Sequence, residues 1–92
     1  KRVMMKNESG WIDATKEFGP EFKKVWAYQG YTFSKALNEY VVSTVGLVSK
    51  TVKEDRFLAY CLMDCLPLGR FYHASQGKKK VLAHLVKEAL TG

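Results

Sequence analysis

Two cysteines and two histidines, Cys61, Cys65, His73 and His84, are the side chains of this chain best able to bind a metal ion. Two thiolates and two imidazoles can hold zinc tetrahedrally. Structural zinc sites take their ligands from tight pairs, with about three to five residues between paired histidines, whereas ten residues separate His73 from His84. Both cysteines also fall on an apolar stripe where they can pack as small hydrophobes. The sequence therefore predicts buried thiols, with no metal site and no cofactor.

Acid, base and nucleophile roles find little support in the spacing. A cysteine nucleophile paired with His73 or His84 would need an electropositive, partly exposed thiol, and Asp64 stands between the two cysteines instead. The adjacent carboxylates Glu54 and Asp55 suit the first turn of a helix, where negative charge complements the helix dipole. We therefore expect a chain without catalytic activity.

A basic cluster with interleaved aromatic residues is the main functional signal. Ammonium and guanidinium groups contact phosphates, and aromatic rings stack on bases. Three consecutive lysines at the start of a helix lie at the positive end of its dipole, which is unfavourable unless an anion binds there. The alternative is a solvated helix face. The predicted partner-binding residues are Arg70, Tyr72, His73, Lys78, Lys79, Lys80 and Lys87, with Phe71 nearby.

The net charge of +6 is concentrated at the two ends of the chain. Residues 1–7 contribute +3, residues 65–92 contribute +4, and residues 8–64, with seven basic and eight acidic side chains, contribute −1. An excess of this sign favours acidic partners and speeds encounter with them.

The element that would position these residues is an apolar segment at 52–66. Residues 51–54 have the pattern of a capping box, and the apolar residues that follow recur at helical spacing. These residues are Phe57, Leu58, Cys61, Leu62, Cys65 and Leu66. A helix that is apolar on most of its surface is a buried one, so we expect 52–66 to be the central helix of the core.

Three further helices are expected at 20–29, 33–50 and 77–90, with a short helix at 11–18 before them. Pro20 suits the first position of a helix and Gly30 a C-terminal stop. The segment 40–48 is rich in β-branched residues, which leaves a strand as the alternative there. Gly46 in this segment marks a weak point or a close approach of another backbone. The predicted fold class is all-α, a small compact bundle of four principal helices.

Ninety-two residues suit a single domain, 1–92. The first residue, Lys1, indicates a processed chain or a domain cut from a longer protein, and residues 1–10 read as a loose basic lead-in. Two cysteines are too few for the disulfide framework of a small secreted domain, so we expect an intracellular, reducing compartment. No apolar run approaches the ~20 residues that a membrane-spanning helix needs.

The sequence thus predicts a non-catalytic basic helical interaction module that docks onto an acidic protein segment or a nucleoprotein within a larger assembly. The alternative is direct, largely sequence-independent binding of RNA or DNA through the same basic cluster. A third hypothesis is a homodimer that uses the aromatic residues between Trp11 and Phe33, since surface Trp and Tyr favour protein interfaces, or a basic face that rests on anionic lipid. The identity of the partner and the oligomeric state stay open.

Overall fold

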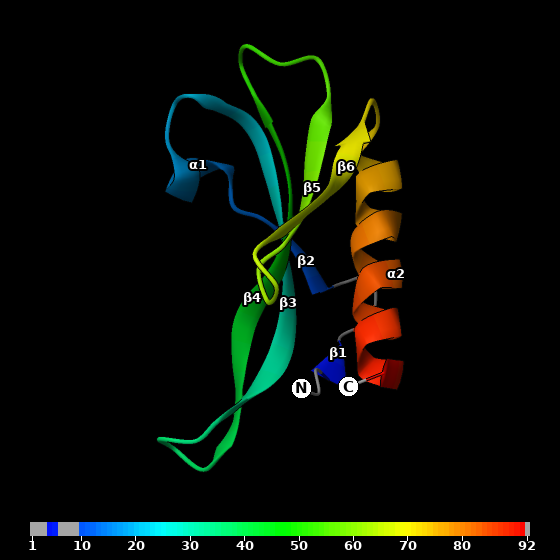
Figure 1. The fold of residues 1–92 in the computed structure, drawn as a ribbon. Helices are drawn as coiled ribbons and strands as arrows, with labels where there is room; N and C mark the ends of the chain where they lie inside the picture. The colour runs from blue at the N-terminus through cyan, green and yellow to red at the C-terminus, as the bar shows by residue number, and fades with distance from the viewer. Residues whose placement is uncertain (1–3, 6–9, 92) are drawn as a thin grey trace.

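A computed structural model describes residues 4–5 and 10–91, and these residues form six strands and two helices (Figure 1). The strands are β1 (Met4–Met5), β2 (Trp11–Asp13), β3 (Phe22–Ser34), β4 (Glu39–Thr51), β5 (Phe57–Cys61) and β6 (Leu66–Phe71), and the helices are α1 (Thr15–Phe18) and α2 (Ala74–Thr91). The strands form one antiparallel sheet in the order β1-β3-β4-β5-β6, and β2 also pairs with β3.

The expected all-α bundle is therefore wrong. Of the four principal helices predicted, only 77–90 lies in a helix, α2. The segment 20–29 belongs mostly to β3, and 33–50 contains the turn between β3 and β4 and most of β4. The short helix expected at 11–18 is a strand in its first part and α1 in its second. Most of the lead-in expected at 1–10 lies outside the described residues.

The segment 52–66, expected to be the central helix, contains strand β5 with a turn on either side. The capping-box chemistry is present, but it closes a turn: the amide and hydroxyl of Thr51 both donate to Oε1 of Glu54. The second turn contains no glycine, and Cys65 adopts the positive φ of 51° that reverses the chain. The strand looked helical because it is apolar on both faces, a pattern that periodicity alone cannot separate from a buried helix.

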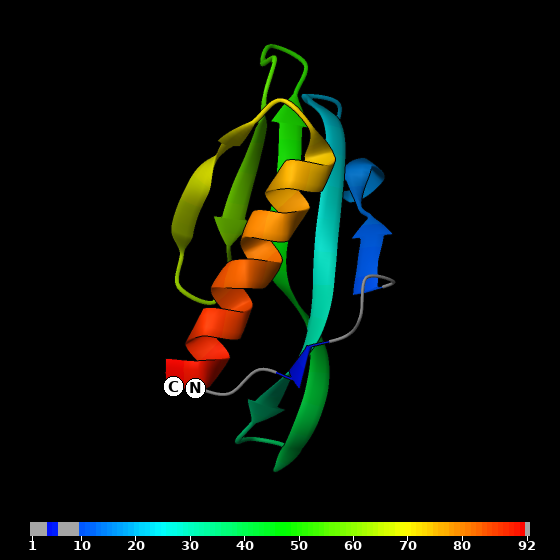
Figure 2. The same ribbon diagram turned by 90° about the vertical axis from the view of Figure 1, so that its right-hand side faces the viewer.

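The sheet is built on a long hairpin of β3 and β4, whose far end extends beyond the rest of the molecule in both views (Figures 1 and 2). Tyr28 pairs with Gly46 and Gln29 pairs with Thr44, so Val45 is an extra residue that forms a β-bulge. The bulge keeps Val45 buried in the core. Bulges of this kind bend a strand and increase its twist.

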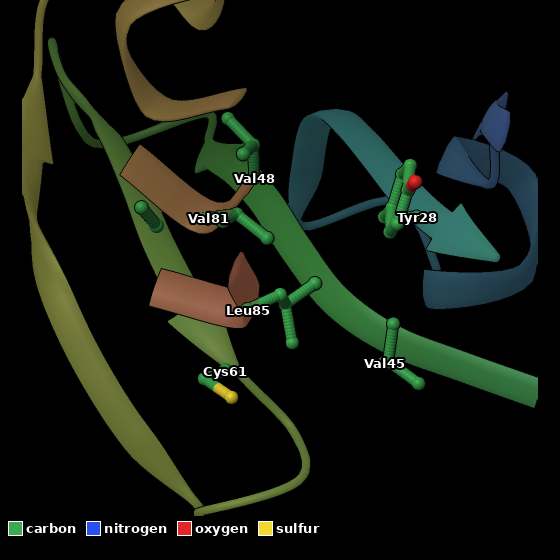
Figure 3. Packing of buried hydrophobic residues seen from close by; sticks show 7 residues of the cluster. Tyr28, Val45, Val48, Cys61, Val81 and Leu85 are labelled. Atoms are coloured by element: carbon green, nitrogen blue, oxygen red, sulfur yellow. The ribbon is translucent and has the colours of Figure 1, made fainter. Parts of the chain in front are cut away.

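Helix α2 lies across one face of the sheet and contacts β4, β5 and β6 (Figure 2). Val81 and Leu85 on its inner side pack against strand residues, as Figure 3 shows. The buried cluster consists of Tyr28, Val45, Val48, Ala59, Cys61, Val81 and Leu85. Within the described part of the chain, no helix has the length and apolar character needed to cross a membrane.

The short helix α1 lies on the other side of the sheet from α2 (Figure 1). A smaller buried cluster lies on the α1 side of the sheet. It consists of Ala14, Val25 and Ala27, and Phe22 and Leu47 pack against it. The sheet is thus apolar on parts of both faces, which removes the simple alternation that identifies a half-buried strand.

Candidate functional site

The ammonium groups of two lysines, Lys24 of β3 and Lys78 of α2, lie over the ring of Trp26. The Nζ atom of Lys78 is 3.8 Å from the centre of this ring, and that of Lys24 is 4.8 Å from it. Lys78 also lies 5.6 Å from the ring of Trp11, on the neighbouring strand. Cation–π contacts at these distances hold the ammonium groups near the rings.

The strand register extends this arrangement across the sheet. Lys24 of β3 lies directly opposite Lys50 of β4, whose Nζ atom is 4.8 Å from the ring of Phe57. Like charges directly opposite each other in a sheet are destabilising, so this pairing has a cost in the free protein. We call this surface the lysine–aromatic strip: Trp11, Lys24, Trp26, Lys50, Phe57, Lys78 and Lys79.

One carboxylate offsets part of the positive charge. Asp13 of β2 binds Nζ of Lys24 at 2.7 Å and accepts hydrogen bonds from the amide and hydroxyl of Thr15. The hydrogen bond from Lys24, followed by those from Thr15, holds the pKa of Asp13 well below its ordinary value. Burial, and then the charge of Lys24, lowers the pKa of Lys78. Within the described residues, Lys50, Lys78 and Lys79 form no ion pair.

A hollow of about 180 Å³ opens on the strip between β2 and the first turns of α2. It is lined by Trp11, Ser75, Lys78, Lys79 and Leu82. The half-buried ring of Trp11 packs at a tilt against Tyr28, with 5.1 Å between ring centres. Ammonium and hydroxyl groups here can bind a phosphate, while the indole offers a flat surface to a base.

The structure separates the four lysines predicted to bind a partner. Lys78 and Lys79 belong to the strip, whereas Lys80 and Lys87 line a second hollow beside His84, Pro67 and Leu68. Consecutive residues of a helix are turned by about 100° from one another, so a run of three lysines cannot face one way.

The other predicted binding residues also have different surroundings. Arg70 forms an ion pair of 2.7 Å with Glu54, and Tyr72 lies under the guanidinium group of Arg56 at 5.5 Å. His73 precedes α2, where its carbonyl accepts the backbone amide of Gln76. Hydrogen bonds from Thr51, followed by the one from Arg70, lower the pKa of Glu54. Arg70 and Tyr72 thus contact groups that belong to neither of the two hollows lined by the lysines.

Sequence reasoning missed Lys24 and Lys50, and it assigned Trp11 and Trp26 to a possible homodimer interface, apart from the basic cluster. Lys24, Trp26 and Tyr28 alternate along β3, a period-two signal that was available in the sequence. Their alignment with Lys50 depends on strand register, which no local pattern reveals. Both thiols were predicted to be buried, but only Cys61 is, and Cys65 is exposed. Of the cysteine–histidine set, Cys61 and His84 come together with Asp64, and Cys65 and His73 do not join this group.

No family model, curated protein or solved structure matches the chain.

Proposed function

We propose that the chain is a non-catalytic module that binds single-stranded nucleic acid through the lysine–aromatic strip. The observation that carries this proposal is the placing of Lys24 and Lys78 over Trp26, with Trp11 beside them. Positive charge and flat aromatic surface are thus combined at one place, as binding to phosphates and bases requires. The free thiols of Cys61 and Cys65 support action in a reducing compartment.

A single strand suits this surface better than a duplex. Stacking of a base on an aromatic ring contributes about 1–3 kcal/mol, and only an unpaired base offers its face. A phosphate between or above Lys24 and Lys50 would be attracted to both ammonium groups, although Lys24 is paired with Asp13 in the free protein. The net charge of +6 would speed the encounter.

An acidic protein segment is the alternative partner. It could satisfy the ammonium groups of Lys50, Lys78 and Lys79, but it would leave the exposed part of the Trp11 ring without a stacking partner. We therefore favour nucleic acid, and the experiment is designed to separate the two classes.

The only two tryptophans of the chain, Trp11 and Trp26, both lie on the strip, so their fluorescence reports binding without a label. We expect single-stranded DNA or RNA to quench this fluorescence. An abasic strand with the same number of phosphates should bind more weakly and quench less. Equal binding by the abasic strand and by polyglutamate would support the acidic-protein alternative and contradict base stacking.

Two double variants of equal charge test the location. Lys78→Ala/Lys79→Ala removes two ammonium groups from the strip, and Lys80→Ala/Lys87→Ala removes two from the second hollow of the same helix. Each phosphate contact on a single strand contributes about −0.7 to the slope of log K against log salt concentration. The first variant should reduce the slope by about 1.4 and the second should leave it nearly unchanged. Equal changes of the salt slope in the two variants would mean that nucleic acid does not bind at the strip, or that it binds through the net charge of the whole surface.

A further inference from the structure

Three metal-binding side chains from three elements converge on the side of α2 that faces β5. Cys61 is the last residue of β5, Asp64 lies in the turn that follows, and His84 lies in α2. One sulfur, one oxygen and one nitrogen atom of these residues lie within 4.8 Å of one another. Sγ of Cys61 is 3.7 Å from Oδ2 of Asp64, and Nε2 of His84 is 2.8 Å from the same oxygen.

We propose that Cys61, Asp64 and His84 bind a zinc ion, with water as the fourth ligand. Zinc bonds of about 2.3 Å to sulfur and about 2.1 Å to oxygen and nitrogen imply tetrahedral separations of about 3.6 Å for S···O and about 3.4 Å for N···O. The S···O distance of 3.7 Å already has this value. The N···O distance of 2.8 Å is that of a hydrogen bond, and it would open by roughly 0.6 Å when the ion replaces the shared proton.

The donor set indicates which metal would bind. A thiolate and an imidazole select zinc over magnesium or calcium, which prefer oxygen ligands alone. Cys61 is fully buried in the core, His84 is mostly buried, and Asp64 is the most exposed of the three. An ion would therefore enter from the side of Asp64, where solvent can supply the fourth ligand. Three protein ligands and one water form a coordination that zinc proteins use.

The charges near the site favour binding of a dication. The thiolate and the carboxylate contribute two negative charges, which balance the ion. Lys80 and Lys87 line the hollow beside His84 and act against a cation, but neither replaces a ligand. Binding releases the thiol proton of Cys61 to solvent and leaves Nε2 of His84 unprotonated, with the ring proton on Nδ1. The ion would then join β5, the following turn and α2.

The test uses the full chain, freed of metal with a chelator and purified without a histidine tag. Zinc is added in competition with a chromophoric chelator, and cobalt is used in parallel because a thiolate ligand gives a sulfur-to-metal charge-transfer band. We expect the protein to withhold about one equivalent of zinc, to show the thiolate band with cobalt, and to melt at a higher temperature with zinc.

Variants separate this site from adventitious binding. His84→Gln and Asp64→Asn, both outside the buried core, should abolish zinc retention while the circular dichroism spectrum stays native. Cys65→Ser, which alters the exposed thiol outside the group, should bind as the parent chain does. The proposal is overturned if the parent chain withholds no zinc from the chelator, or if His84→Gln retains it as well as the parent.

Discussion

Gly46 of β4 lies against Val81 of α2 so closely that a methyl group on Gly46 would be 2.5 Å from Cγ1 of Val81. Real Cβ atoms essentially never show this separation, so one of the two elements must shift, and Val81 is fully buried. Gly46→Ala should therefore push α2 away from the sheet. We expect a loss of about 1–3 kcal/mol in the free energy of unfolding, measured by urea denaturation.

Gly77→Ala is the matched control, because Gly77 lies in α2 and faces Val48 of β4 across the same helix–sheet contact. A methyl group there would lie 3.0 Å from Cγ1 of Val48, a tight contact but a less severe one. Alanine also favours a helix over glycine by about 1 kcal/mol, which offsets part of the strain. The loss at Gly77 should be clearly smaller than the loss at Gly46; a larger loss at Gly77 would contradict this account of the helix–sheet contact.

Gly46 also illustrates how much of the fold could be predicted from the sequence. Gly46 was expected to mark a weak point or a close approach of another backbone, whereas the atom that approaches most closely is in a side chain, Cγ1 of Val81. The helix predicted around it was wrong because the apolar residues between Phe33 and Val48 belong to the end of β3, a turn and β4, and β4 has a bulge and two apolar faces. The β-branched residues at 40–48 were the better signal.

Some residues of the candidate site could be identified from local sequence patterns, and others could not. Lys78 and Lys79 were identified because they were predicted to lie in the first turn of a helix. The helix is present, but α2 begins at Ala74, so both lysines lie in its second turn, beyond the free amides of the helix start. Lys24 and Lys50 are 26 residues apart in the sequence. They become neighbours only through the antiparallel register, which depends on turn position and the bulge at Val45. The periodicity of apolar residues along the sequence does not show which distant strands pair.

The ion pair between Asp13 and Lys24 predicts a variant that gains affinity. Asp13→Asn removes the carboxylate that neutralises Lys24, so the strip acquires one more available ammonium group. We expect tighter binding of single-stranded nucleic acid and a salt slope steeper by about 0.7. Asp55→Asn makes the same change in net charge beside Arg56, outside the strip. If both variants gain equally, net charge alone controls binding.

Asp13 also predicts the response of the fold to acid. Its pKa is lowered in the folded protein by the hydrogen bonds of Lys24 and Thr15, so its stabilising contribution is fully present above the ordinary value of 3.8. The contribution is lost as the pH falls from that value toward the lower folded pKa. Asp13→Asn should therefore lose less stability than the parent chain on acidification, when urea unfolding is compared at about pH 6 and about pH 2. Equal losses would show that the ion pair has no energetic role.

The far end of the hairpin provides the last prediction. There β5 no longer pairs with β4, and β1 pairs with β3 only at Gly30 and Tyr31, so the residues beyond Tyr31 pair between β3 and β4. There Phe33 and Tyr40 lie opposite each other, with ring centres 5.4 Å apart in an edge-to-face arrangement. A double-mutant cycle with Phe33→Leu and Tyr40→Leu should give a coupling of about 0.5–1 kcal/mol.

A cycle that joins Phe33→Leu with Val86→Ala, on the exposed side of α2, should be additive within about 0.5 kcal/mol. Urea unfolding of the single and double variants measures both couplings. Both cycles share Phe33→Leu, so a coupling at Phe33 and Tyr40 no larger than the control would mean that the contact between the two rings does not stabilise the fold, as expected if this end of the hairpin unfolds separately from the core. Its rings would then contribute nothing to global stability, although the strands there are paired.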